Sequence, residues 1–282
     1  MDILDAIKNN VIFFDGGTGT ELQKKGIDCE PVLANIKYAQ EAQTICGAYI
    51  NVGANIVTAN TFGAYSHKHE NYKELIAAAF CNARARAAID GDKKVWIALD
   101  LGPTGLMLEP YGDVPHEEVS EIFAGTIEAG VKNGADIILI ETMMDINELE
   151  LAIVQAKKTG LPVFATMSFD SNGRTMYGAS ISDMAELAER LEVDAIGMNC
   201  GNGLDAYQTL TPELLKSTDL PVIIQPNAGL PKIEDGKISY DLSPIAFGAF
   251  MQKLKNDGVR VLGGCCGTTP AHIAEMVRMC AE

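Results

Sequence analysis

The stretch Ile137-Ile138-Leu139-Ile140 is apolar at every position, and the same lack of alternation recurs in Val95-Trp96-Ile97-Ala98-Leu99 and Val222-Ile223-Ile224. A strand with one face in water alternates apolar and polar residues, whereas a strand that is covered on both faces is apolar throughout. Such runs are typical of the parallel strands of α/β proteins. The sequence therefore predicts a parallel sheet that is buried on both faces.

A short apolar run followed by a helical pattern occurs eight times along the chain, which is the order of elements in parallel βα units. The predicted strands lie near residues 11–15, 55–60, 95–100, 136–141, 162–169, 194–200, 221–226 and 259–264. The predicted helices lie near residues 37–52, 70–90, 116–133, 146–159, 182–192, 205–217, 243–257 and 269–280. Two pairs, Ser182-Asp183 and Ser243-Pro244, have the residue types of helix starts.

The number of cycles predicts how the sheet is arranged. Eight βα units in about 250 residues are the usual size of a closed (β/α)8 barrel. No linker, charge block or low-complexity segment divides the 282 residues. We therefore predict the α/β class and a single (β/α)8 TIM barrel that forms one domain, residues 1–282. A doubly wound open sheet is the alternative, because periodicity alone does not show closure.

The composition argues against several classes of partner. Hydrophobic residues make up 47% of the chain, and the 38 acidic and 22 basic residues give a net charge of −16. This field repels phosphate backbones and anionic lipid headgroups, so neither nucleic acid nor a membrane surface is expected as a partner. No apolar run reaches the roughly 18 residues of a membrane span, and no signal peptide follows Met1. We expect a soluble, cytoplasmic protein.

Polar and sulfur-containing side chains stand where the predicted strands end. They are Asp15, Asn60, Asp100, Glu141, Asp170, Cys200, Asn227 and the pair Cys265-Cys266. The C-terminal strand ends of a (β/α)8 barrel form one rim, and active sites are built there. No lysine ends a strand, which argues against Schiff-base chemistry.

Three of the seven cysteines fall on this rim. Cys200 ends the sixth strand and Cys265-Cys266 end the eighth, so the thiols are near neighbours in a closed ring. Three thiolates with an open fourth position suit a catalytic Zn²⁺, because structural zinc normally has four protein ligands. The alternative is a buried apolar thiol beside a redox pair or a small-residue turn. Plain thiols are expected at the other positions, Cys29, Cys46, Cys81 and Cys280.

A series of motifs carries a resemblance to a known family. In chain order they are Asp15-Gly16-Gly17-Thr18-Gly19-Thr20-Glu21, Asn60-Thr61-Phe62-Gly63, Leu101-Gly102-Pro103-Thr104-Gly105, Glu141-Thr142, Met198-Asn199-Cys200, Pro226-Asn227-Ala228-Gly229 and Gly263-Gly264-Cys265-Cys266-Gly267-Thr268-Thr269-Pro270. Over its whole length the chain resembles the homocysteine S-methyltransferase family, zinc-dependent barrels that methylate homocysteine to methionine.

Two features indicate a subfamily. Asn60-Thr61-Phe62-Gly63 and Gly267 are most similar to the N-terminal homocysteine-binding module of cobalamin-dependent methionine synthase. The S-methylmethionine enzymes tend to have arginine in place of Gly267, and the betaine enzymes differ in the first glycine loop. Both are less similar and stay as alternatives.

The resemblance implies a cofactor, a substrate and a donor. Cys200, Cys265 and Cys266 would be the zinc ligands, and homocysteine would react as a zinc-bound thiolate. An alkyl thiol is only a few per cent ionised at neutral pH, and a coordinated thiol loses its proton to the metal's charge. Because one barrel uses all 282 residues, the methyl group is expected from a separate corrinoid or folate-binding protein.

Four further residues are candidates for substrate binding. Glu141 ends an apolar strand and is placed to pair with the substrate ammonium group, the role that the resemblance also implies. The alternative is a structural hydrogen bond to a neighbouring loop. Asp15 would bind the amino-acid head group or order the glycine loop. Asn199 and Asn227 would bond substrate or its supporting residues, or simply bond backbone as buried asparagines commonly do.

Other interpretations compete with this one. A glycosidase would use Glu141 with Asp100 or Asp170 as its carboxylate pair, but 6% aromatic residues and one tryptophan argue against a sugar platform. A non-catalytic barrel would hold zinc only for stability or for docking a partner. A phosphate site at Gly17-Thr18-Gly19 lacks the third glycine of the dinucleotide pattern. His67 and His69 are expected to be solvated loop residues rather than a metal pair.

Overall fold

The computed structural model describes residues 2–87, 94–201, 203–234 and 237–281. Eight parallel strands form its central sheet: β1 (Ile12–Phe13), β2 (Ile56–Ala59), β3 (Trp96–Leu101), β4 (Ile137–Met143), β5 (Val163–Met167), β6 (Ala195–Cys200), β7 (Val222–Pro226) and β10 (Val261–Leu262). Their spatial order is β1-β10-β7-β6-β5-β4-β3-β2. The two ends of this order meet, because Phe14 forms a parallel bridge to Ile56 and Asn55 N–H donates to the Phe13 carbonyl at 2.7 Å.

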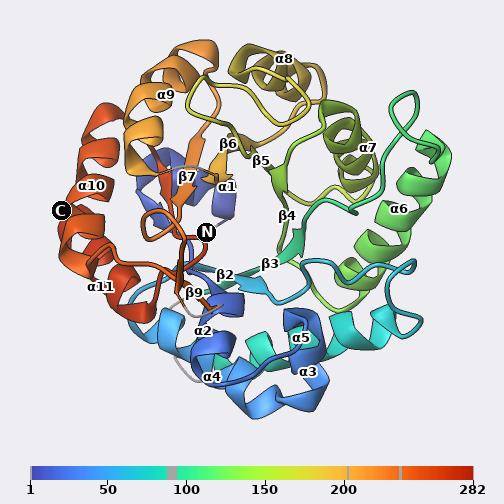
Figure 1. The fold of residues 1–282 in the computed structure, drawn as a ribbon, viewed down its shortest axis with the longest axis horizontal. Helices are drawn as coiled ribbons and strands as arrows, with labels where there is room; N and C mark the ends of the chain where they lie inside the picture. The colour runs from blue at the N-terminus through green and yellow to red at the C-terminus, as the bar shows by residue number, and fades with distance from the viewer. Residues whose placement is uncertain (1, 88–93, 202, 235–236, 282) are drawn as a thin grey trace.

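The predicted (β/α)8 barrel is therefore confirmed, and the open-sheet alternative is wrong. The helices that follow the strands surround the sheet (Figure 1): α4 (Ala39–Asn51), α5 (Tyr72–Ala87), α6 (His116–Lys132), α7 (Ile146–Lys157), α8 (Ile181–Arg190), α9 (Leu204–Ser217), α10 (Pro244–Asp257) and α11 (Pro270–Cys280). Each predicted strand and helix is present. Residues 88–90 of the predicted helix 70–90 lie outside the described residues. No helix in the described ranges is long and apolar enough to cross a membrane.

One of the two predicted helix starts is wrong. Helix α8 begins after Ser180, whose hydroxyl accepts the Asp183 N–H at 3.1 Å while the Asp183 carboxylate accepts the Ser180 N–H at 2.7 Å. This capping box satisfies two donors at once, which Ser182 cannot do from inside the first turn. The other start is confirmed, since the Ser243 hydroxyl accepts the Ala246 N–H at 3.2 Å.

Several short elements were not predicted: α1 (Ile3–Asn9), α2 (Thr18–Lys24), η1 (Pro31–Leu33), α3 (Ala34–Lys37), and the hairpin of β8 (Lys232–Glu234) and β9 (Lys237–Ser239). Helix α1 has a clear structural role. Ile3 and Ile7 are each 1% exposed and pack with residues that begin the strands, Ile12, Ile56 and Trp96 among them. The helix therefore closes the N-terminal end of the barrel, and the site lies at the opposite end.

Candidate metal and substrate site

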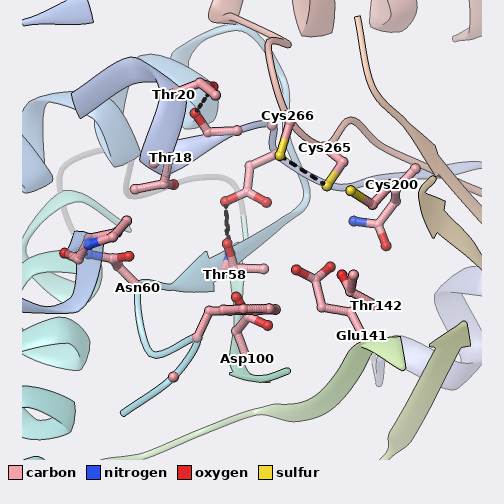
Figure 2. Close-up of a pocket in the computed structure, with 18 of the residues that line it drawn as sticks. Thr18, Thr20, Thr58, Asn60, Asp100, Glu141, Thr142, Cys200, Cys265 and Cys266 are labelled. Carbon is pink, nitrogen blue, oxygen red and sulfur yellow. Dashed lines mark hydrogen bonds between the residues drawn. The ribbon is translucent and has the colours of Figure 1, made fainter. Parts of the chain in front are cut away.

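A cavity of about 480 Å³ opens where the strands end, a size typical of small-molecule sites. Its wall is formed by the loop from β1 into α2 and by residues at the ends of β2, β3, β4, β6, β7 and β10. Of the sequence-predicted site residues, this wall contains Asp15, Glu141, Cys200, Cys265 and Cys266. Sequence reasoning thus identified the side chains that converge on the cavity (Figure 2).

The three rim cysteines come together as a cluster. Their sulfur atoms lie within 4.8 Å of one another, and Cys265 Sγ is 4.0 Å from Cys266 Sγ. Cys200 has a left-handed backbone with φ of 57°, and its carbonyl accepts the Tyr207 O–H. Such backbone strain in a non-glycine residue is concentrated at functional sites. Cys265 is held by its N–H, which donates to the Pro226 carbonyl at 2.9 Å.

The donor set of this cluster fits a soft divalent cation. Hydrogen bonds from the thiols of Cys265 and Cys266 lower the pKa of Cys200, and the pairing with Cys200 together with burial raises the pKa of Cys265. One thiolate therefore forms readily, while the other protons are held. Ionising all three thiols would place like charges side by side, and a thiolate-binding ion such as Zn²⁺ would offset that repulsion. Within the described ranges, no fourth Cys, His, Asp or Glu joins the cluster.

Glu141 is held beside the cluster by Asn199. The Asn199 Oδ1 accepts the Thr142 N–H at 2.8 Å and the Thr166 O–H at 2.7 Å, which leaves Nδ2 to donate to Glu141 Oε2 at 3.2 Å. Thr142 has φ of 60°, so its backbone also needs this support. Burial, and then the negative charges of Cys200 and Asp15, raise the pKa of Glu141 to about 8. Asn199, 1% exposed, thus lies behind the cavity wall and orients Glu141.

Asp15 joins two strands as well as lining the cavity. Its Oδ2 accepts the backbone N–H of Thr58 at 2.8 Å and the Thr58 hydroxyl at 3.1 Å. The side chain is 3% exposed, and burial raises its pKa to about 7. The glycine loop that follows packs on the cysteine loop, because a Cβ at Gly17 would lie 2.7 Å from the Cys265 carbonyl oxygen. The loop's glycines therefore serve close packing.

Asn227 also supports the cluster from behind the wall. The side chain is 4% exposed, and its hydrogen bond to the Cys200 sulfur helps to lower the pKa of that thiol. Its Nδ2 lies 3.5 Å from the Gly201 carbonyl. The Oδ1 atom is buried and accepts no hydrogen bond from the part of the chain that the structure describes.

The comparisons with known proteins agree with this geometry. Residues 12–280 match the model of a family described as homocysteine S-methyltransferase. The chain belongs to the homocysteine S-methyltransferase family. It is 30% identical over 305 aligned positions to the methionine synthase of Mycobacterium tuberculosis and 29% identical to that of Mycobacterium leprae. It covers 25% of each, so it spans about a quarter of the length of these curated relatives.

Solved structures show the same fold. The chain superposes on the homocysteine methyltransferase MmuM from Escherichia coli with a TM-score of 0.79 for the metallated form and 0.76 for the apo form. The identity is 22%, and the matches cover 97% and 96% of each chain respectively. At this identity the likeness concerns the barrel itself.

Two candidates from the sequence are not at the site of this homocysteine S-methyltransferase family member. Asp170 lies on an exposed loop after β5, where its carboxylate accepts the N–H groups of Asn172 and Arg174 at 2.8 and 3.0 Å. It therefore caps a turn and is no partner for Glu141. His67 bonds the Thr104 carbonyl at 3.1 Å, and His69 Nε2 lies 3.3 Å from Oε2 of Glu30.

Sequence reasoning missed one residue next to the cysteine cluster. Tyr240 follows β9, and its hydroxyl hydrogen-bonds the Cys266 sulfur. The pairing with Cys200 raises the pKa of the Cys266 thiol to about 11, and the hydrogen bond with Tyr240 opposes this rise. Its ring covers Gly267, where a Cβ would overlap the ring. The only signal in the sequence was the glycine after the cysteine pair, since nothing local shows that a distant loop returns to it.

Proposed function

We propose that the protein is a zinc-dependent methyltransferase that converts homocysteine to methionine, with Zn²⁺ held by Cys200, Cys265 and Cys266. The observation that carries this proposal is the convergence of three sulfur atoms within 4.8 Å on the wall of a cavity that also contains Glu141. Membership of the homocysteine S-methyltransferase family supports the reaction class. Residues 1–282 would act as a single homocysteine-binding domain.

Zinc, when bound, would lower the pKa of the substrate thiol so that sulfur is a nucleophile at neutral pH. The chain's own residues do the rest by binding and orienting. Glu141, kept in place by Asn199, accepts a hydrogen bond from the substrate ammonium group. Holding the thiol close to the incoming methyl carbon and aligned with it supplies much of the rate, because binding has already brought the reacting atoms together.

The carboxylate end of homocysteine faces the start of α2. Thr18 and Thr20 line the cavity there, and the helix begins after Gly17, which has no side chain to cap it. The first N–H groups of a helix have no partner within the helix and attract negative charge. The acidic wall would thus face the ammonium group of homocysteine, and the start of α2 would face its carboxylate.

The methyl donor would be delivered by a separate corrinoid or folate-binding protein. The segments that follow β2, β3, β5 and β7, at the cavity's end of the barrel, carry large exposed apolar side chains: Phe62, Met107, Tyr111, Met176, Tyr177, Leu230, Ile233 and Ile238. Contiguous exposed apolar patches mark interaction surfaces, and a donor protein that docks at this end would cover these side chains. A reducing compartment such as the cytoplasm would keep the thiols in the form that binds metal.

Gly267 favours this donor over S-methylmethionine. The resemblance associates arginine at this position with the S-methylmethionine enzymes. Here the Tyr240 ring occupies the position that the Cβ atom of an arginine at residue 267 would take. Betaine and S-methylmethionine remain the comparison donors for the test.

The test is a methyl-transfer assay with zinc-loaded protein and homocysteine. The donors are methylcobalamin, a methylated corrinoid protein, methyl-folate, S-methylmethionine and betaine. We expect methionine with the corrinoid or folate donors, and none from the Cys200→Ala variant. Turnover that is independent of zinc would overturn the mechanism, and turnover with S-methylmethionine or betaine alone would overturn the donor assignment.

A further inference from the structure

A third carboxylate of the cavity, Asp100, has no function in the mechanism above. It lies in β3, which is buried at all six positions, and its side chain is 6% exposed. Its backbone is tied to the loop after β2, since its N–H donates to Thr61 Oγ1 at 3.0 Å and its carbonyl accepts the Thr61 O–H at 2.8 Å. These bonds fix where Asp100 stands and leave its carboxylate uninvolved.

One oxygen of the Asp100 carboxylate has no hydrogen-bond partner in the part of the chain that the structure describes. Its Oδ1 is shielded from water and accepts no hydrogen bond from any described residue, although the side chain lines the cavity. An ionised carboxylate in such a place is costly unless a cation or donor reaches it. Burial, and then the charges of Glu141 and Asp15, raise the pKa of Asp100 well above its usual range. The Asp100 carboxyl group therefore ionises readily only when a cation or a further hydrogen-bond donor reaches it.

No Lys, Arg or His of the described residues forms an ion pair with Asp100. Lys68 lines the same cavity, but its Nζ lies over the Tyr65 ring, 5.6 Å from the ring centre. None of the ion pairs found among the described residues includes Asp100 or Glu141. In the view of Figure 2, Glu141 lies between Asp100 and the three cysteines, and both acidic groups line the same cavity as the sulfur cluster.

We propose that Asp100 and Glu141 together bind the ammonium group of the substrate, and that Asp100 restricts the site to thiols that carry an α-amino group. This inference rests on the proposed function, in which homocysteine is the thiol. An ammonium group has three N–H donors, and one oxygen of Glu141 is already bonded to Asn199. Asp100 supplies the further acceptor, and the ammonium supplies the positive charge that lets the buried pair ionise.

The test compares two thiols that differ only in the amino group, homocysteine and 4-sulfanylbutanoate. Binding of each to zinc-loaded protein is measured by calorimetry for the wild type, for Asp100→Asn and for the control Asp170→Asn on its exposed loop. We expect Asp100→Asn to raise the Kd of homocysteine about ten- to a hundredfold, the worth of a charge-assisted hydrogen bond. The Kd of 4-sulfanylbutanoate and the zinc content should stay unchanged, and Asp170→Asn should change neither ligand.

The ratio of the two Kd values decides the outcome. The assignment would be overturned if the ratio of the two Kd values in Asp100→Asn equals the ratio in the wild type. This includes the case in which both thiols bind more weakly by the same factor, because Asp100 would then only support the fold. Should Asp100→Asn not fold, Asp100→Ser is measured against the same ratio. If the zinc-loaded wild type binds neither thiol, the proposed function fails. If the wild type binds homocysteine and Asp100→Asn binds it equally well, only the inference about Asp100 fails.

Discussion

The contact between Asn199 and Glu141 makes a quantitative prediction for Asn199→Asp. The substitution keeps the oxygen that accepts from Thr142 N–H and Thr166 O–H, at 2.8 and 2.7 Å. It replaces the Nδ2 donor by a carboxylate oxygen 3.2 Å from Glu141 Oε2. Shape and two hydrogen bonds therefore survive, while the contact becomes repulsive once Glu141 ionises, above about pH 8.

The magnitude follows from the distance and the burial. Two unit charges 3.2 Å apart repel by about 5 kcal/mol at an effective dielectric constant of about 20. Because the pKa of Glu141 is already about 8, the wild type keeps the Glu141 proton at pH 7, and the variant can share that proton between its two carboxyl groups. The repulsion therefore acts above about pH 8, where the folded variant retains a proton that the folded wild type releases, and the stability of the variant relative to the wild type falls by about 1.4 kcal/mol per pH unit. We expect a relative loss of about 3 kcal/mol near pH 10 and little loss at pH 7.

Urea unfolding of four zinc-loaded proteins at pH 7 and pH 10 measures this effect. They are the wild type, Asn199→Asp, Glu141→Gln and the double variant. The double variant should recover most of the lost stability, because one carboxylate is gone and the remaining pair can hydrogen-bond. A loss that is equal at both pH values, or that Glu141→Gln does not relieve, would refute the placement of Asn199 against Glu141.

Three further predictions test other parts of the structure. The raised pKa of Asp15, about 7, means that the folded state holds a proton which the unfolded chain loses above about pH 4. As the pH is raised from 4 to 7, the unfolding free energy of Asp15→Asn, measured with urea, should therefore rise by about 2–4 kcal/mol relative to that of the wild type. Ile7→Ala should lower the unfolding free energy by about 2–5 kcal/mol without changing zinc content, since Ile7 is buried at the far end of the barrel. Gly267→Ala should weaken zinc binding in a chelator competition by displacing Tyr240, whereas Gly160→Ala, which has a similar positive φ but open space around it, should not.

Much of the fold was predictable because burial on both faces leaves a strong mark on a sequence. Runs such as Ile137-Ile138-Leu139-Ile140 located strands, and eight repeats predicted closure. The convergence of Cys200 with the Cys265-Cys266 pair followed from their positions at strand ends. Helix α1 was missed because a seven-residue helix is too short for its hydrophobic period to be detected, and its stability comes from packing on the barrel.

The functions of single polar residues were less predictable. Asn199 was a candidate for substrate binding, but the sequence does not reveal that its amide is engaged by Thr142 and Thr166 from neighbouring strands. Asp100 ends an apolar strand as Glu141 does, and only the structure separates a carboxylate held by an amide from one without a partner. These properties depend on contacts between residues far apart in the chain.

The central claim is that the three clustered cysteines hold a zinc ion with a position open for the sulfur of homocysteine. X-ray absorption at the zinc edge tests it directly by counting sulfur neighbours with and without homocysteine. We predict three sulfur neighbours in the protein alone, one from each residue of the cluster, and a fourth when homocysteine is added. A sulfur count that homocysteine leaves unchanged, or protein that retains no zinc after loading, would contradict the account.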